Sequence, residues 1–194
     1  MQFLLDIAVT AVSLTVIAEF VWAMRFHFKT DKMALAAKSI SLIGTLAIIL
    51  FIYLQFTRVQ PIAVLVAGVA LGVLSSVIFI AAIRASRKAQ LYFVFEGRRP
   101  DALLKDGPFA YIRHPFYASY VLLWGAWGLA TWAPISVLPV AVLTAIYVNA
   151  ARGEERNIAL SPLAADYAQY KRQAGFFWPR LGGTATGAPA TPQK

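Results

Sequence analysis

The sequence predicts an all-α integral membrane protein, a polytopic fold with about five transmembrane helices. Of its 194 residues, 59% are hydrophobic and only 14% are charged, and the mean hydropathy is +0.64. A soluble domain carries roughly a quarter charged residues. Several apolar runs are also long enough to cross a bilayer, which takes about 20 residues of helix. These observations favour a membrane protein over a soluble helical one.

The first three spans are expected at residues 3–24, 34–57 and 61–83. No basic segment precedes the first run, and Asp6 and Glu19 lie inside it. Secretory signal peptides have a basic start and an uncharged apolar centre. We therefore expect the first run to be a membrane span rather than a cleaved signal.

A tight helical hairpin is expected from the last two apolar runs, 116–132 and 134–150. Only Ala133-Pro134 separates them, and proline interrupts the hydrogen-bond ladder of a helix. The two runs together are too long for a single crossing. Each of them is close to the lower limit for spanning the membrane.

The polar segment after the hairpin, residues 154–180, predicts a short amphipathic helix followed by aromatic residues on the cytosolic membrane surface. Residues 1–181 are expected to form one domain. Residues 182–194 are rich in glycine, alanine, threonine and proline, which predicts a flexible tail.

Positive charge sets the expected orientation of the chain. The net charge is +9. Cations gather in the first loop, in the loop after the third span and in the C-terminal segment: Arg25, Lys29, Lys32, Arg84, Arg87, Lys88, Arg98, Arg99, Lys105, Arg113, Arg152, Arg156, Lys171, Arg172 and Arg180. The other two connections carry only Arg58. The positive-inside rule then places the N-terminus outside and the C-terminus in the cytoplasm. We attribute the charge to topology and anionic headgroups, and expect no nucleic-acid binding.

Polar and small residues inside the spans are expected to serve packing. Glu19 and Lys38 lie at matching depths, which predicts an ion pair between the first two helices. Asp6 is close enough to the outer end of its span to reach the interface. His27 is expected to face solvent or headgroups. Close helix packing is predicted at small residues of the third and fourth spans, including Gly68, Gly72, Gly125 and Gly128.

Cysteine and histidine usage limits the chemistry. The chain has no cysteine, which excludes disulfides, thiolate metal sites and cysteine nucleophiles. Only two histidines are present, so we expect no metal centre.

The stretch 106–117, Asp-Gly-Pro-Phe-Ala-Tyr-Ile-Arg-His-Pro-Phe-Tyr, carries the strongest functional signal. Gly107-Pro108 predicts a turn, and Pro115 suits the first position of a helix with His114 at its cap. A helix start presents backbone N–H groups and partial positive charge, and Arg113 adds a permanent cation. This combination suits a carboxylate or phosphate. An interfacial anchor of arginine and tyrosines explains the same residues equally well.

Glu154-Glu155 strengthens the functional interpretation. The hairpin returns the chain to the same membrane face at about residue 150, so the two acids should lie near the start of the fourth span. Adjacent acids at the C-terminal end of a helix are unfavourable with its dipole unless they meet a cation. That cation is either a nearby arginine, in simple surface salt bridges, or the ammonium or sulfonium group of a ligand.

These motifs resemble a known family. The pattern at 106–117, the hairpin, the acid pair and Tyr167-x-x-Tyr170 running to Pro179 are similar to the integral membrane methyltransferases, which include isoprenylcysteine carboxyl methyltransferases and phospholipid N-methyltransferases. The resemblance covers about residues 90–180.

The resemblance implies an S-adenosylmethionine-dependent methyltransferase with a lipophilic acceptor that enters from the bilayer. It implies a cytosolic cofactor site made by Gly107, Tyr111, His114, Pro115, Tyr117 and Glu154. The expected catalytic residues are Glu154, Glu155 and Arg113. The expected acceptor-binding residues are Tyr167, Tyr170 and Arg172.

Three points stay open at this stage. The acceptor could be an isoprenylcysteine-like carboxylate, a phospholipid amine or another hydrophobic small molecule. Sterol reductases resemble the same C-terminal architecture, so a nicotinamide-dependent membrane reductase is an alternative. A membrane protein that kept the fold without the activity is another.

Overall fold

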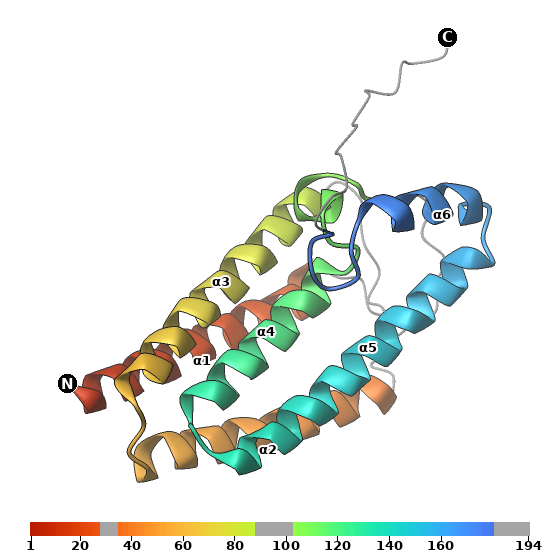
Figure 1. Ribbon diagram of the computed structural model, residues 1–194. Helices are drawn as coiled ribbons and strands as arrows, with labels where there is room; N and C mark the ends of the chain where they lie inside the picture. Colours follow the sequence, from red (N-terminus) through yellow and green to blue (C-terminus); the bar gives the residue numbers. More distant parts are fainter. Residues whose placement is uncertain (28–34, 88–102, 181–194) are drawn as a thin grey trace.

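The computed structural model describes residues 1–27, 35–87 and 103–180, except for the side chains of residues 35–38. In these ranges the chain is helical, as predicted, and extended backbone pairs only in an isolated parallel bridge between Ile112 and Gly175. The α-helices are α1 Gln2–Phe26, α2 Leu35–Thr57, α3 Ile62–Ser86, α4 Pro115–Ala130, α5 Val137–Ala159 and α6 Ala164–Gln173 (Figure 1). Two short 3-10 helices, η2 Gly107–Ala110 and η3 Pro134–Ser136, precede α4 and α5. The predicted tail 182–194 and the loop cations Lys29, Lys32, Lys88, Arg98 and Arg99 lie outside the described residues.

Four of the described helices are long and apolar enough to cross a membrane: α1, the Ser39–Thr57 part of α2, α3, and Pro134–Ala159. Their outward side chains are largely apolar, which suits contact with lipid rather than water. The predicted span 116–132 corresponds to α4, which has 16 residues and is shorter than these four. The predicted span 134–150 lies within a longer helical stretch, because η3 and α5 together run from Pro134 to Ala159.

Close approach of α3 and α4 to their neighbours depends on glycine at three of the four predicted positions. A Cβ on Gly68 would lie 2.6 Å from the Cβ of Ala130 in α4, and one on Gly72 would lie 2.9 Å from Val12 in α1. Gly128 is similarly close to Val140 of α5. The prediction was wrong for Gly125, where a Cβ would meet nothing within 4 Å.

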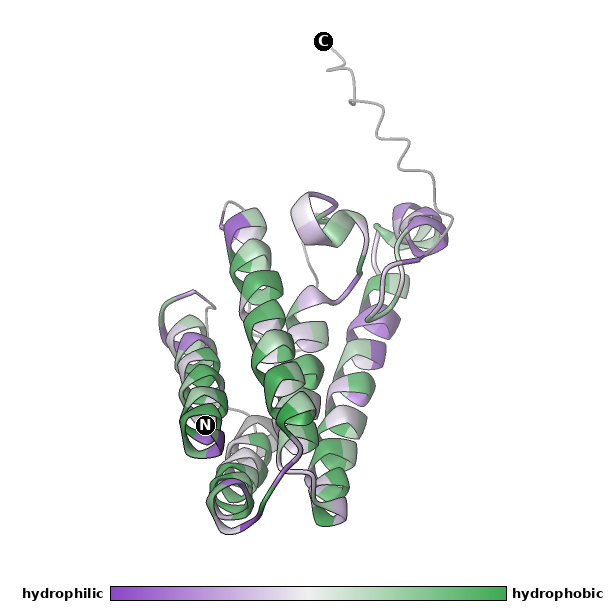
Figure 2. Cartoon of the chain, turned by 60° about the vertical axis from the view of Figure 1, so that its left-hand side comes forward, coloured by the Kyte–Doolittle hydropathy of each residue, from purple (hydrophilic) through white to green (hydrophobic). Residues whose placement is uncertain are grey.

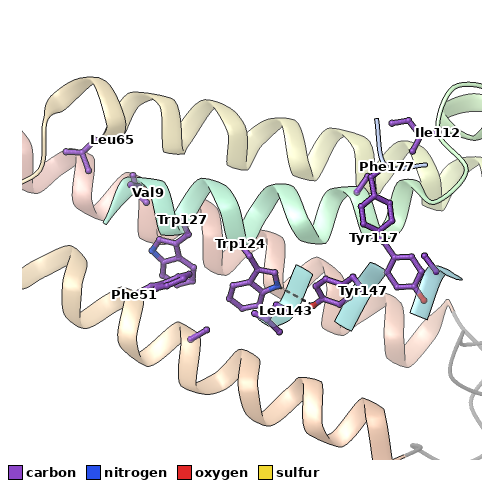
Figure 3. Packing of buried hydrophobic residues seen from close by; sticks show 14 residues of the cluster. Val9, Phe51, Leu65, Ile112, Tyr117, Trp124, Trp127, Leu143, Tyr147 and Phe177 are labelled. Carbon is purple, nitrogen blue, oxygen red and sulfur yellow. Dashed lines mark hydrogen bonds between the residues drawn. The ribbon is translucent and has the colours of Figure 1, made fainter. Parts of the chain in front are cut away.

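A row of aromatic rings fills the core between α4 and its neighbours (Figure 3). Trp127 is fully buried, and its ring lies edge-on to Phe51 of α2 with centroids 5.7 Å apart. Trp124 donates a hydrogen bond to the Tyr147 hydroxyl of α5 at 3.3 Å. The predicted hairpin between α4 and α5 is present, and its turn places Trp132 at a φ of 49°. The packed rings fix α4 as the central helix against which α2, α3 and α5 lie.

Polar residues inside the bundle are bonded to neighbouring helices. Asp6 is buried, contrary to the expectation that it reaches the interface, because Gln55 of α2 donates a 2.7 Å hydrogen bond to it. Glu19 accepts hydrogen bonds from Ser76 of α3. The side chain of Lys38, its predicted partner, lies outside the described residues. His27 is partly buried and lies 2.9 Å from the Ser86 hydroxyl, so it packs against α3 rather than facing only solvent or headgroups.

Hydrophilic residues concentrate at the end of the bundle that carries α6 (Figure 2). The C-terminal ends of α1, α3 and α5 and the start of α4 meet at this end (Figure 1). The motif stretch and the acid pair therefore come together, as the hairpin predicted.

Candidate functional site

A turn at Gly107 and the short helix η2 lead the chain into α4. Gly107 has a φ of 57°, a conformation that favours glycine, and η2 follows it directly. A Cβ on Gly107 would lie 3.2 Å from Ala85, so this turn packs on the end of α3. Pro115 is the first residue of α4 and His114 is its N-cap, as the sequence predicted. Gly107 is therefore a structural turn residue in this fold.

Residues 174–178, here called the C-terminal strap, cross over the start of α4. The Arg113 N–H donates to the Gly175 carbonyl at 2.8 Å, and the Gly175 N–H donates to the Tyr111 carbonyl at 2.9 Å. The His114 N–H donates to Phe176 at 3.3 Å. Gly175 is required for this path, because a Cβ there would lie 1.8 Å from the Trp178 carbonyl oxygen. No motif in the sequence predicted a role for Gly175.

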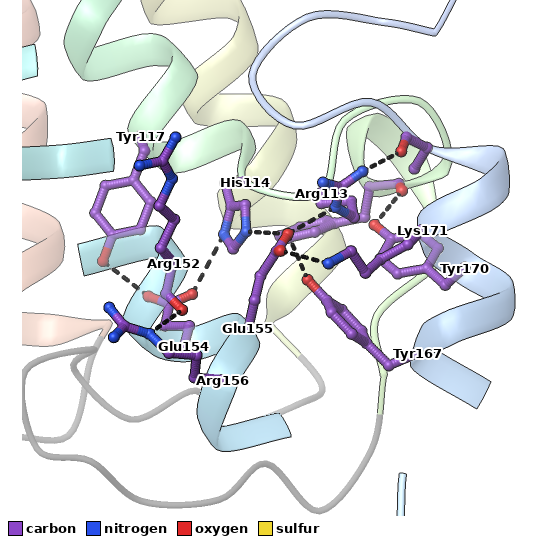
Figure 4. Close-up of polar contacts among 12 residues, drawn as sticks. Arg113, His114, Tyr117, Arg152, Glu154, Glu155, Arg156, Tyr167, Tyr170 and Lys171 are labelled. Atoms are coloured by element: carbon purple, nitrogen blue, oxygen red, sulfur yellow. Dashed lines mark hydrogen bonds and ion pairs between the residues drawn. The ribbon is translucent and has the colours of Figure 1, made fainter. Parts of the chain in front are cut away.

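Glu155 joins three elements at the site (Figure 4). Its carboxylate accepts hydrogen bonds from Arg113 Nε at 2.8 Å, Lys171 Nζ at 2.9 Å and the Tyr167 hydroxyl at 3.0 Å. His114 Nε2 lies 3.3 Å from the same carboxylate. The side chains of Arg113 and Glu155 are only 11% and 12% exposed. Four partners saturate Glu155, so it connects α4, α5 and α6.

Glu154 has fewer partners and is more open than its neighbour. Its carboxylate accepts a hydrogen bond from the Tyr117 hydroxyl at 2.8 Å and lies 3.3 Å from His114 Nδ1. Its side chain is 27% exposed. Of the two acids, Glu154 therefore has the greater capacity to meet a ligand.

His114 bridges the two acids from the cap of α4. Burial lowers the pKa of its imidazole, but hydrogen bonds and charge from Glu154 and Glu155 outweigh burial, so the pKa lies above the ordinary value of 6.5. A raised pKa favours the imidazolium, in which both ring nitrogens donate. The charged ring thus holds both carboxylates at the start of α4.

The two α6 tyrosines face inward rather than toward the membrane surface. Tyr167 and Tyr170 are each 4% exposed, and Tyr170 donates a hydrogen bond to the Phe109 carbonyl. Burial raises the pKa of both phenols, so they remain neutral donors. Arg172 is exposed, and no contact among the described residues joins its guanidinium to the acid pair. Tyr111 is 58% exposed and takes part in the site through its backbone carbonyl.

Aromatic rings form a wall from the acid pair into the bundle. Phe176 and Phe177 of the strap lie 5.0 and 6.3 Å from the His114 ring, measured between centroids. Tyr117 lies 6.3 Å from Phe177 and 5.9 Å from Tyr147 of α5. Phe177 is 8% exposed, so the aromatic segment predicted to lie on the membrane surface folds inward, apart from the exposed Trp178. Phe177 and Tyr147 were not among the site residues predicted from the sequence.

Helices long and apolar enough to span a membrane, with two acids, a capping histidine and aromatic rings clustered at one end, define a helical membrane protein with a candidate polar site. Comparison with known families specifies this class: a family model described as phospholipid methyltransferase matches residues 63–159, half of the chain. The chain belongs to this family of membrane methyltransferases. No curated protein and no solved structure matches it.

The matched range differs from the resemblance seen in the sequence. It includes nearly all of α3, which the motifs did not single out, and it ends with α5. The acid pair and the stretch 106–117 lie inside it. The strap and α6 lie beyond it, so their part in the site rests on the contacts described above.

Proposed function

We propose that this protein transfers a methyl group from S-adenosylmethionine to a lipophilic acceptor in the membrane. The observation that carries the proposal is Glu154, a partly exposed carboxylate joined to Tyr117 and His114 beside aromatic rings. Membership of the phospholipid methyltransferase family supports methyl transfer over the nicotinamide-dependent alternative.

The donor set fits a zwitterionic cofactor with a flat ring. Glu154 would meet its positive groups, and the first turn of α4, which begins at Pro115, would offer backbone N–H groups to its carboxylate. The rings of Tyr117, Phe176 and Phe177 would give an adenine apolar surroundings beside Glu154. When bound, the cofactor supplies a methyl group already activated by its sulfonium.

The protein's own contribution would be positioning, exclusion of water and, for an amine acceptor, removal of a proton. Glu154 is the group that would take that proton, because its carboxylate has only two partners in the described part of the chain. A carboxylate acceptor would need no base. Glu155 and Arg113 would act as positioning residues that hold α4, α5 and α6 together.

The test is calorimetric titration of the purified protein with S-adenosylhomocysteine, repeated on Glu154→Ala and, as a matched control, on Asp166→Ala. Asp166 is an exposed acid in the first turn of α6. We expect micromolar binding to wild type and to the control, and at least a tenfold loss in Glu154→Ala. A response to NADPH with none to S-adenosylhomocysteine, in protein shown to be folded, would favour the reductase alternative. Equal binding by all three proteins would remove Glu154 from the site.

We further propose that the N-terminus lies outside and that the site and C-terminus face the cytoplasm. The end of the bundle with α6 carries the exposed cations Arg25, Arg84, Arg152 and Arg180, which supports this orientation. The chain has no native cysteine, so a single introduced cysteine can report which side of the membrane its position faces. Arg180→Cys should be protected from an impermeant maleimide in intact cells, and Val59→Cys, at an exposed position between α2 and α3, should be labelled. The opposite labelling pattern would indicate the opposite orientation in the membrane.

A further inference from the structure

A cleft between α5 and α6 lies beside the acid pair. It has a volume of about 500 Å³ and is lined by Asn149, Arg152, Glu155, Arg156, Ala159 and Lys171. Four of the α5 residues, at positions 149, 152, 156 and 159, are spaced by three or four and therefore share one face of the helix. The function proposed above does not use this face.

The cleft has an excess of positive charge. Its single acid, Glu155, already accepts hydrogen bonds from Arg113 and Lys171. Arg156 Nε donates to the Arg152 carbonyl at 3.2 Å, and no carboxylate among the described residues pairs with either guanidinium. Two exposed arginines therefore face the cleft with most of their donors available for an anion.

The same face of α5 becomes apolar toward the membrane. Leu138 and Val142 are 63% and 39% exposed, and they precede Asn149 and Arg152 at the spacing of one helical face. From Val142 to Arg152 the rise is about 15 Å, which is close to half the thickness of the hydrocarbon core. An apolar strip that ends in arginines at this distance matches the acyl chain and phosphate of a phospholipid.

We propose that this cleft binds the phosphate of an anionic membrane phospholipid, with its acyl chain along the Leu138–Val142 face of α5. Guanidinium groups bind phosphate through paired, charge-assisted hydrogen bonds, and Asn149 adds a neutral donor. Lys171 lines the cleft and also binds Glu155, so a bound phosphate would contact the network that holds α6 on α5. The proposal is independent of the methyl acceptor and of the cofactor.

The test is native mass spectrometry of the full chain in a neutral detergent with short-chain phosphatidylglycerol. Diacylglycerol of the same chain length and inorganic phosphate serve as the other two probes. The cleft variant is Arg152→Gln with Arg156→Gln. The control, Arg25→Gln with Arg84→Gln, removes two exposed arginines from the same end of the bundle and outside the cleft.

We expect wild type and the control to retain phosphatidylglycerol but not diacylglycerol. The cleft variant should bind it roughly tenfold more weakly or worse, since it loses two of the three cations that line the cleft. Higher salt should weaken binding to wild type, which tests the charge dependence without any variant. Equal retention by both variants, or no effect of salt, would overturn the proposal. Inorganic phosphate binding as tightly as the lipid would assign the cleft to a free anion. Loss of S-adenosylhomocysteine binding in the cleft variant, with lipid binding intact, would assign it to the cofactor.

Discussion

Replacing Glu155 by glutamine should destabilise the protein more than the same change at Glu154. Glu155 and Arg113 form a largely buried pair, and removing one charge from a fully buried pair costs about 3–5 kcal/mol. The Lys171 contact adds little, because that side chain is 46% exposed and surface pairs contribute about 0–1 kcal/mol. Glutamine keeps one oxygen as an acceptor, so we expect the lower end, about 3 kcal/mol, which corresponds to a fall in Tm of about 6–12 °C.

The assay is thermal unfolding in detergent at a fixed scan rate, followed by the fluorescence of the five tryptophans. Glu154→Gln is the matched control, because it makes the same change one residue away at a side chain that is 27% exposed and has fewer partners. We expect it to lose less than half as much in Tm as Glu155→Gln. A Glu155→Gln protein within about 2 °C of wild type, or a larger loss in Glu154→Gln, would refute the division of roles between the two acids.

The described contacts support four further predictions. Gly175→Ala should release the C-terminal strap, because the added Cβ has no room against the backbone, and trypsin should cut the C-terminal region faster; an unchanged digestion rate would contradict this. In carbon-13 NMR of imidazole-labelled protein, His114 should titrate above pH 6.5. His27 should titrate below pH 6.5, because burial and the charge of Arg87 lower its pKa. The reverse order would be inconsistent with the site geometry. Charged His114 should stabilise the folded protein. This stabilisation should be fully present below the unfolded pKa of about 6.5 and lost as pH rises through the higher pKa of the folded state. The Tm of His114→Gln should lack this pH dependence. Gly68→Val should lower stability by about 1–3 kcal/mol through overpacking against α4, measured as Tm, and Gly125→Val, which has open space, should cost less; equal losses would argue against the packing.

The sequence predicts most of the helices and the meeting of the motif with the acid pair. Both depend on local patterns: long apolar runs locate the spans, and a hairpin returns residues 154 and 155 to the start of α4. The prediction 134–150 concerned only the apolar part of the last span, because hydropathy marks where a helix leaves apolar surroundings rather than where its hydrogen bonds stop. The helix runs on to Ala159 with the two acids inside it.

Contacts between distant segments could not be predicted from local pattern. Gly175 and Phe177 have no motif around them, and their roles appear only when the strap is paired with residues 111–114. The burial of Asp6 likewise depends on an amide of another helix, Gln55, 49 residues further along the chain. The inward turn of Tyr167 and Tyr170 follows from their bonds to Glu155 and Phe109, which no spacing rule specifies.

The C-terminal strap has a consequence for how the protein is made. The N–H groups of Arg113 and His114, just before α4, find their partners in residues 175 and 176, which are synthesised after all the long helices that the structure describes. A growing chain therefore inserts its spans before the ligand site can close. Ligand binding would then report that synthesis has passed the strap, and a chain that stops after α5 would enter the membrane with the start of α4 uncovered.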